Sequence, residues 1–536
     1  MKKSAALLSA LLLAASGAQA LAQQQTLTVC TEASPDTLSA VLSSANTSFD
    51  VAEQYGDRLV EMEIGGSKLL PALATSWTIS DDGLRYTFKL RHGVKWQSNA
   101  AFKPSRTFNA DDVVFSFSRA LDKNHPYAKV GGGDYPLFNA LVIPALKAVS
   151  KIDDDTVLFE MNVPQASLLG AISVQPFTIG SAEYADAMLK AGTPDQFDRA
   201  PIGTGPFQLV TYQQNSLVRF RANPDFWGKT DGMPDRAAKV DNLVFSITPD
   251  PAVRFAKLRV GECHVARYPN PADLDAIRAA SGVRVIESTI ASMSYLTFRN
   301  DKKPFDDHRV REALAVSIDL DNLVKAVYQG TAAPTAALVP ISLWGSNTQV
   351  KPRPYDPAKA KKLLAEAGYP NGFSLDIWAL PVARAYMPNG KRAAEMIQAD
   401  WAKIGVTAKI VTFEWGEYLR RVRSGEADVA MLGGTWDYPD PAQLTVSFSC
   451  EQLTTGRNVA KWCDPTYSDL IRRAGITSDR DTRAKLYIEA QQVFHDAIPA
   501  MLFADPKAFV ALRSNVQGYK LHSLGGQPLG GVSVTP

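Results

Sequence analysis

The strongest constraint on the fold is the order of strand-like and helix-like runs between positions 373 and 440. Residues 373–379 alternate apolar and polar side chains, and residues 406–410 and 428–432 form two further strand-like runs. Two helix-like runs separate them, one with an apolar face that ends at Gly405 and one over residues 417–424. Strands joined by helical crossovers lie parallel in one sheet. The pattern therefore predicts a parallel α/β unit.

Opposite charges follow the first and third of these strands. Arg384 comes after the first strand, and the segment GGTWDY, residues 433–438, follows the third and contains Asp437. In open parallel sheets, ligands bind at the edge formed by the carboxyl ends of the strands. Arg384 can hold a carboxylate with two hydrogen bonds, and Asp437 can accept from an ammonium group, so a small zwitterion such as a free peptide is complementary. On the residues alone, a surface pair or two solvated charges is the alternative.

The rest of the chain also mixes short strands and helices. Residues 77–94 predict a hairpin with Asp82-Gly83 in its turn, and Asn109 followed by two acids predicts the start of a helix. There is no low-complexity tract and no fixed-period repeat. We expect a mixed α/β architecture throughout.

The first residues carry the pattern of a secretory signal. Two lysines precede an apolar run over residues 5–15, and small residues follow up to Ala22. The run is shorter than the roughly 20 apolar residues that span a membrane. We expect residues 1–22 to be a signal peptide cleaved after Ala20 or Ala22, and the mature protein to be released into the periplasm of a Gram-negative bacterium without a lipid anchor.

The balance of charge excludes two classes of partner. The chain has 57 Lys and Arg against 55 Asp and Glu, and two of the lysines leave with the signal. Without a basic block or stripe, nucleic acid and an anionic membrane surface are poor partners. The length of 536 residues exceeds what one core organises, so two or more lobes are expected.

The four cysteines allow three pairings in an oxidising compartment. Cys450 and Cys463 would close a loop of about 13 residues, which chain-entropy estimates value at about 3 kcal/mol. Cys30 and Cys263 are then left to join each other. Four unpaired thiols are the alternative, which export makes unfavourable.

A peptide hydrolase is the rival from another functional class. It needs a nucleophile with a base and an oxyanion site, or a metal. The sequence has neither G-x-S-x-G nor H-E-x-x-H, and its six histidines are scattered. His264 follows Cys263, but a disulfide would occupy that thiol. We expect no enzyme, no metal site and no cofactor.

Several blocks of the sequence resemble the periplasmic dipeptide-binding proteins, members of the family of peptide- and nickel-binding components of ABC importers. The resemblance runs essentially from Thr26 to the C-terminus. Its most specific stretches are SDDGLRYTFKLRHGVKW (80–96), FNADDVVFSFSRA (108–120), PIGTGPFQL (201–209), LVFSITPDPAVRFAKL (243–258), EMIQADWAKIGV (395–406) and VTFEWGEYLRR (411–421).

The resemblance implies a two-lobed periplasmic-binding-protein fold with a hinge and an additional third domain. Lobe I would gather residues 23–57, 208–289 and 507–536. The third domain would hold residues 58–207, and lobe II residues 290–506. Cys30 and Cys263 then both fall in lobe I, and Cys450 and Cys463 both fall in lobe II, in agreement with the pairing above.

The resemblance also implies roles for individual residues. Asp437 occupies the place of the acid that takes the ligand's amino group, and Arg384 that of the arginine that takes its carboxylate. Ser44 falls where the family has a small hydroxyl residue contacting the ligand from lobe I. Gly434, Thr435 and Trp436 are expected beside the ligand. Trp436 departs from the family pattern and either lines a side-chain pocket or packs internally, and Asp440 is a second candidate for the amine site.

The function implied is the periplasmic substrate-binding component of an ABC transporter, which captures short peptides, above all dipeptides, for the inner-membrane permease. Fixed charges at both ends of a cavity would measure ligand length, because a longer peptide leaves a terminus unpaired. Binding of oligopeptides, of a metal chelate or of haem is the alternative within the family. A monomer is expected.

Overall fold

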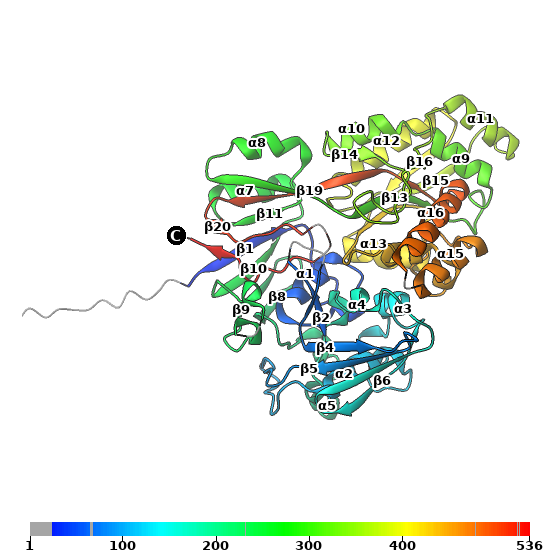
Figure 1. Ribbon diagram of the computed structural model, residues 1–536. Coiled ribbons are helices and arrows are strands. Elements are labelled where there is room, and N and C mark those ends of the chain that lie inside the picture. Colours follow the sequence, from blue (N-terminus) through cyan, green and yellow to red (C-terminus); the bar gives the residue numbers. More distant parts are fainter. Residues whose placement is uncertain are drawn as a thin grey trace, which may run out of the picture.

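The computed structural model describes residues 24–64, 68–230, 232–477, 479–522, 524 and 526–535. The expected signal peptide, residues 1–22, lies outside these ranges. Figure 1 shows two large bodies side by side and a third below them, each built around its own sheet. The chain is thus a mixed α/β protein with the two-lobed arrangement and additional domain that the sequence predicts.

The first lobe is built on an eight-stranded sheet. Its strands follow the order β12-β19-β11-β1-β10-β9-β8, and β14 pairs with β19. The central strand β1 runs parallel to β10 and β11, and the outer pairs are antiparallel. The bounds are β1 Thr26–Thr31, β8 Phe207–Gln213, β9 Leu217–Ala222, β10 Asn242–Ile247, β11 Val265–Arg267, β12 Val283–Thr289, β14 Ala332–Pro334 and β19 Ala504–Arg513.

Two helices cover this sheet, α7 (Pro251–Val260) and α8 (Leu274–Ala279). Helix α7 begins where Asp250 accepts a hydrogen bond from the backbone of Val253 and ends at Gly261, whose φ of 86° is open to glycine. Helix α1 (Asn46–Tyr55) follows β1 and packs between this sheet and the third domain. Two short pairs, β2 (Val60–Met62) with β3 (Leu69–Pro71) and β20 (Val516–Gln517) with β21 (Ser533–Val534), complete the strands of this region.

The second lobe is built on a five-stranded sheet in the order β16-β15-β17-β13-β18. Strand β15 (Ser374–Trp378) lies parallel to both β16 (Thr407–Val411) and β17 (Val429–Thr435), which confirms the predicted parallel unit. The crossovers are α12 (Gly390–Ala402) and α13 (Trp415–Ser424). Strands β13 (Ser292–Phe298) and β18 (Ala500–Leu502) continue the sheet in antiparallel pairing.

The third parallel strand is longer than its sequence pattern predicts. We expected it to end at Leu432, but β17 pairs with β13 as far as Thr435, opposite Ser292. The two glycines therefore lie inside the strand. A Cβ atom on Gly433 would lie 2.4 Å from the carbonyl oxygen of Met293, so this close approach of the two backbones requires glycine.

The remaining helices of the second lobe surround this sheet. Their bounds are α9 His308–Val316, α10 Leu320–Tyr328, α11 Pro357–Glu366, α14 Ala442–Thr445, α15 Pro465–Ile476 and α16 Arg480–Ala497. Their apolar faces join the sheet in one buried cluster, in which Trp401 is fully enclosed. No helix in the described ranges has the length and hydropathy to cross a membrane.

The third domain holds a four-stranded antiparallel sheet, β4-β5-β7-β6. Its strands are β4 Ala74–Ile79, β5 Arg85–Leu90, β6 Leu146–Asp153 and β7 Thr156–Met161. The predicted hairpin is β4-β5, and the predicted helix is α2 (Ala110–Leu121), where Asn109 and Asp112 form a reciprocal cap. The other helices are α3 Pro136–Leu141, α4 Leu168–Ala171, α5 Ala182–Lys190 and α6 Gln196–Arg199.

Two short crossings join the two lobes. The chain leaves the eight-stranded sheet after Thr289 and enters the five-stranded sheet at Ser292, and it returns between Leu502 and Ala504. Among the strands described between these crossings, only the short β14 reaches back to pair with β19. Crossings this short are typical of a hinge, since a few residues at element ends absorb the rotation.

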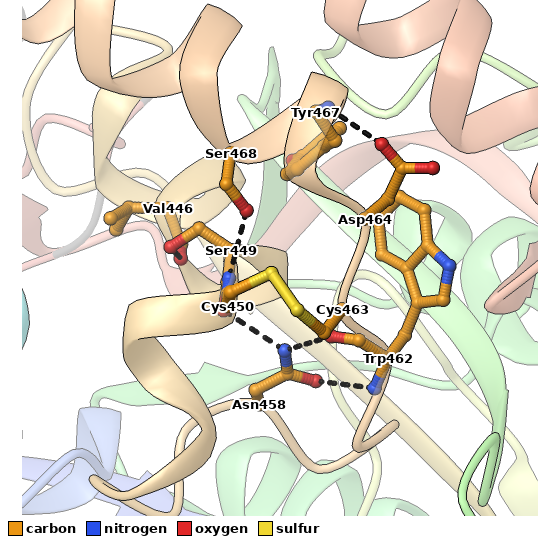
Figure 2. The surroundings of a disulfide bond; sticks show 9 residues. All are labelled: Val446, Ser449, Cys450, Asn458, Trp462, Cys463, Asp464, Tyr467 and Ser468. Atoms are coloured by element: carbon orange, nitrogen blue, oxygen red, sulfur yellow. Dashed lines mark hydrogen bonds between the residues drawn. A yellow bond between two sulfur atoms is a disulfide. The ribbon is translucent and has the colours of Figure 1, made fainter.

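Both predicted disulfides are present. Cys30 in β1 joins Cys263, with Cα atoms 5.8 Å apart, and Cys450 joins Cys463, with Cα atoms 4.6 Å apart. Figure 2 shows the second bond and its surroundings. The first bond ties the central strand of its sheet to the segment just before β11, and the second closes a loop in the other lobe.

Candidate functional site

A cavity of about 140 Å³ lies against the five-stranded sheet and faces α1. The first lobe contributes Ser44, Asn46 and Phe49 to its wall, and the third domain contributes Leu137. The second lobe supplies the rest, namely Met293, Tyr295, Arg384, Tyr386, Trp415, Leu419, Val422, Arg423, Leu432, Gly433, Gly434, Thr435, Asp437, Gln443, Leu444, Ser447, Gly456, Arg457 and Val459. All three bodies of the fold thus meet around one chamber.

Arg384 reaches this cavity from the turn that follows β15. The turn is fixed by two backbone hydrogen bonds between Arg384 and Met387, of 3.0 and 3.1 Å. The side chain is only 2% exposed, and its guanidinium carbon lies 4.7 Å from the centre of the Trp415 ring. Stacking on an aromatic face suits a planar guanidinium and holds it in one plane. Burial lowers the pKa of Arg384 from its usual value.

An acidic residue of the first lobe pairs with this arginine. Glu32 directly follows β1, is fully buried and forms an ion pair with Nη1 of Arg384. Thr31 donates a hydrogen bond of 2.6 Å to the other oxygen of Glu32. Both Nη atoms of Arg384 and Oε1 of Glu32 are buried without a hydrogen-bond partner in the described part of the chain. Glu32 therefore balances the charge of the guanidinium, while Nη2, which takes no part in the ion pair, is left for a ligand.

Asp437 lies two residues beyond the end of β17. Its Oδ2 accepts a hydrogen bond from the amide of Gln443, whose oxygen accepts from the backbone of Asp437 at 2.7 Å. Its Oδ1 is buried, and no described residue bonds to it. Burial, together with the negative charge of Asp50, raises the pKa of Asp437 to about 7 despite the Gln443 hydrogen bond. The side chain is thus a fixed acceptor that gains from a cationic partner.

The other predicted residues divide into two groups. Ser44, Gly434 and Thr435 line the cavity with Arg384 and Asp437. Trp436 is outside the lining: it is fully enclosed in the core of the second lobe, and its backbone donates to Ala291 at 2.7 Å. Because side chains alternate along the extended chain, Trp436 points away from the face that Thr435 and Asp437 share.

Asp440, the second candidate for an amine site, already has a partner. It forms a buried ion pair with Arg483 at 2.8 Å and accepts a backbone hydrogen bond of 3.0 Å from Ala442. It does not line the cavity. These contacts give Asp440 a structural role at the start of α14.

Three charged residues of the site escaped the sequence reasoning. Glu32 could have been found, because it stands at the carboxyl end of a strand that runs parallel to its neighbours. Arg423 lies in the last turn of α13, where a cation is expected for helix stability alone. Arg457 lies in an irregular loop that no periodicity marks.

A larger hollow, of about 360 Å³, lies elsewhere, between the third domain and helices α14 and α15. Its wall is mainly apolar and includes Tyr438, Val163 and Ile471. It lacks the pair of unpartnered opposite charges that distinguishes the smaller cavity. We therefore regard the smaller cavity as the functional site.

Comparison with known proteins is consistent with this geometry. The sequence profile of the family described as bacterial extracellular solute-binding proteins, family 5 Middle, matches residues 68–454. A protein of Escherichia coli (strain K12) named dipeptide-binding protein is 45% identical over 537 residues, covering 100% of this chain and 99% of that protein. A Haemophilus influenzae protein named heme-binding protein A is 41% identical, over 95% of this chain and 92% of its own length.

A solved structure has nearly the same fold. The dipeptide binding protein from Pseudoalteromonas sp. SM9913, crystallised in complex with Met-Leu, matches with a TM-score of 0.91 and 34% sequence identity. The match covers 95% of this chain and 100% of that chain.

Proposed function

We propose a function on the premise that this chain belongs to the bacterial extracellular solute-binding proteins of family 5. The protein is the substrate-binding component of an ABC-type peptide importer, and it is not an enzyme. It captures short peptides, and dipeptides are the ligands that its cavity fits best. We place it in the periplasm, as a monomer that delivers its ligand to an inner-membrane permease.

The observation that carries the proposal is a pair of unsatisfied buried groups in one chamber. Oδ1 of Asp437 and Nη2 of Arg384 both lack hydrogen-bond partners among the described residues, and both side chains line the cavity. A buried polar group without a partner costs about 1–3 kcal/mol, and more when it is charged. A free peptide supplies an ammonium group for Asp437 and a carboxylate for Arg384, and so removes both costs at once.

The remaining wall suits a ligand whose side chains vary. Thr435 lies in β17 beyond the residues that pair with β15, so its backbone groups can reach the peptide bond of the ligand, and Ser44 offers a hydroxyl from the first lobe. The backbone of Gly434 faces Met293 of β13, and Gly434 contributes only to the wall of the cavity. Backbone pairing gives affinity without reading the sequence of a peptide. Trp436 has no part in this arrangement, because it packs in the core.

Closure of the lobes completes the site. The walls come from three bodies, so the cavity exists only when they are together, and rotation at the crossings near Thr289 and Phe503 would open it. A bound peptide stabilises the closed arrangement, which is the form a permease can recognise. We propose that the bodies correspond to lobe I (23–57, 208–289 and 507–536), the third domain (58–207) and lobe II (290–506).

Calorimetric titration with dialanine, trialanine and N-acetyl-dialanine tests the proposal. Dialanine should bind, whereas removal of the ammonium charge by acetylation should weaken binding at least tenfold. The variant Asp437→Asn should lose affinity for dialanine, and Asp376→Asn, an exposed acid on β15, serves as the matched control. Equal affinity for dialanine and its acetylated form would remove the role of Asp437, and equal affinity for trialanine would reject selection by length.

A further inference from the structure

Two more arginines line the same cavity, and neither forms an ion pair with an acid in the described part of the chain. Arg423 comes from the last turn of α13, and Arg457 from the loop between Cys450 and Cys463. One Nη atom of each is buried without a hydrogen-bond partner. Glu32 balances the charge of Arg384, so the remaining charges of the wall are Arg423, Arg457 and Asp437. The wall therefore carries an excess of positive charge.

The guanidinium of Arg457 forms few hydrogen bonds. Its one side-chain hydrogen bond among the described residues runs from Nη2 to the carbonyl oxygen of Gln443, at 3.3 Å, and Nη1 is buried without a partner there. Burial lowers its pKa to about 10, and the neighbouring charge of Arg423 contributes to this, against the opposite effects of Tyr438 and Asp437. Two arginines that line one cavity and influence each other's charge are an arrangement that binds an anionic group.

Negative charges outside the cavity act on Arg423. Burial lowers its pKa, and Asp36 and Asp134, two exposed residues of the first lobe and the third domain, act in the opposite direction. Its position at the end of α13 also interacts favourably with the carboxyl end of the helix. The end of α13 thus gives a structural reason for the position of Arg423, whereas Arg457 lies in a loop and adjoins no helix end.

The loop that carries Arg457 is built to hold it in place. The disulfide closes the loop, and the side chain of Asn458 donates to Ser449 at 3.0 Å and to Trp462 at 2.7 Å, bridging its two arms (Figure 2). The backbone of Arg457 donates to the hydroxyl of Thr455 at 3.3 Å. These contacts hold the backbone of Arg457 in one position. A side chain that only needs to be solvated does not require such a constrained loop.

Arg457 stands beside the amine anchor. Gln443 contacts both residues, since its side chain bonds Asp437 and its carbonyl accepts from Arg457. A group that reaches Arg457 from a peptide whose ammonium lies on Asp437 must therefore come from the first residue of that peptide.

We propose that Arg457, with Arg423 behind it, binds the acidic side chain of the first residue of a dipeptide, so that Glu-X and Asp-X peptides are the preferred ligands. This inference rests on the proposed peptide-binding function and names the substrate class of the same site. Arg457 is then a specificity-determining residue, whereas Asp437 and Arg384 serve every dipeptide.

Titration calorimetry with five peptides tests the inference: Glu-Ala, its neutral isostere Gln-Ala, Ala-Glu, Ala-Gln and dialanine. The wild-type protein should bind Glu-Ala at least tenfold more tightly than Gln-Ala, whereas its affinities for Ala-Glu and Ala-Gln should differ by less than tenfold. In Arg457→Gln the ratio of the affinities for Glu-Ala and Gln-Ala should fall to near one. Arg420→Gln, which changes an exposed arginine on α13, the helix that carries Arg423, should keep the affinity ratio of the wild type.

The wild-type measurement decides the question even if Arg457→Gln does not fold. Equal affinity for Glu-Ala and Gln-Ala, or an acidic preference confined to Ala-Glu, would overturn the inference while leaving the peptide-binding function intact. Failure of all five peptides to bind would instead overturn the proposed function itself.

Discussion

Glu32 and Arg384 form a buried ion pair across the boundary between the two lobes. Glu32 directly follows β1, the central strand of the eight-stranded sheet, and Arg384 follows β15, the middle one of the three parallel strands in the five-stranded sheet. The arginine assigned to the ligand's carboxylate thus already carries an acidic partner. A ligand carboxylate must share that guanidinium with Glu32, and the two negative charges repel each other at close range.

Removal of the charge on Glu32 should therefore strengthen binding of free carboxylates. In Glu32→Gln the amide oxygen can still accept from Arg384, but the repulsion is lost and the ligand becomes the sole counter-ion. We expect the affinity for dialanine to rise about tenfold, which corresponds to about 1.4 kcal/mol. The affinity for alanyl-alanine amide should not rise, because that ligand has no carboxylate. Calorimetry on both ligands checks this, and weaker dialanine binding would show that Glu32 orients Arg384 for the ligand.

Binding should depend on pH through Asp437. Burial raises its pKa to about 7 in the absence of ligand, whereas an ammonium ligand requires the ionised form. Below pH 7 a proton must leave Asp437 before the amine binds, so the affinity for dialanine should increase by up to about tenfold per pH unit as the pH rises from 5 to 7. Above about pH 8 the α-amino group of the ligand loses its charge and affinity should fall again.

Asp437 also affects stability, with a definite sign. Its pKa is higher in the folded than in the unfolded chain, so the folded state binds more protons between pH 3.8 and about 7. Its contribution to the free energy of unfolding therefore falls as the pH rises through that window. In Asp437→Asn, this contribution to the pH dependence of the free energy of unfolding should disappear. The increase in affinity for dialanine between pH 5 and 7 should disappear as well. A rise in affinity that persists in the variant would assign the titration to another residue.

The parallel unit, and the meeting of Arg384 and Asp437 at one cavity, were predictable because they depend on local patterns. Alternation of side chains located the strands, helical crossovers made them parallel, and the shared edge brought Arg384 near Asp437. The extension of β17 through Gly433 was not predictable from that pattern, because it follows from the close approach of β13 across the sheet. The same extension determines which side of the backbone Trp436 occupies.

The pairing of Glu32 with Arg384 could not be read from the sequence for a different reason. The two residues are far apart along the chain, and they meet only through the relative placement of two lobes. Arg457 depends likewise on a disulfide loop whose path is determined by side-chain contacts such as those of Asn458. Tertiary packing, rather than local propensity, decides both positions.

Tyr438, next to Asp437, links the second lobe to the third domain. Its ring is buried in the core shared by the first lobe and the third domain, and a Cβ atom on Gly170 would lie 2.8 Å from that ring. Gly170→Ala should therefore displace Tyr438, disturb the closed arrangement and weaken dialanine binding several-fold. In a Tyr438→Ala background the same change should have little effect, because the ring is gone. Gly475→Ala, in helix α15 with no atom within 4 Å of the new methyl group, is the control. Equal losses from Gly170→Ala in both backgrounds would contradict the contact.

The disulfide between Cys450 and Cys463 should contribute to ligand preference as well as to stability. A closed loop of this length contributes about 3 kcal/mol in the chain-entropy model, so Cys450→Ser with Cys463→Ser should lower the free energy of unfolding by about 2–4 kcal/mol. Because the loop positions Arg457, the same variant should reduce the advantage of Glu-Ala over Gln-Ala. Replacement of Cys30 and Cys263 by serine should lower stability but keep that advantage, since neither residue lies in the loop. Denaturant unfolding and calorimetry measure the two effects separately, and an unchanged preference in the first variant would show that Asn458 and Thr455 alone hold the loop.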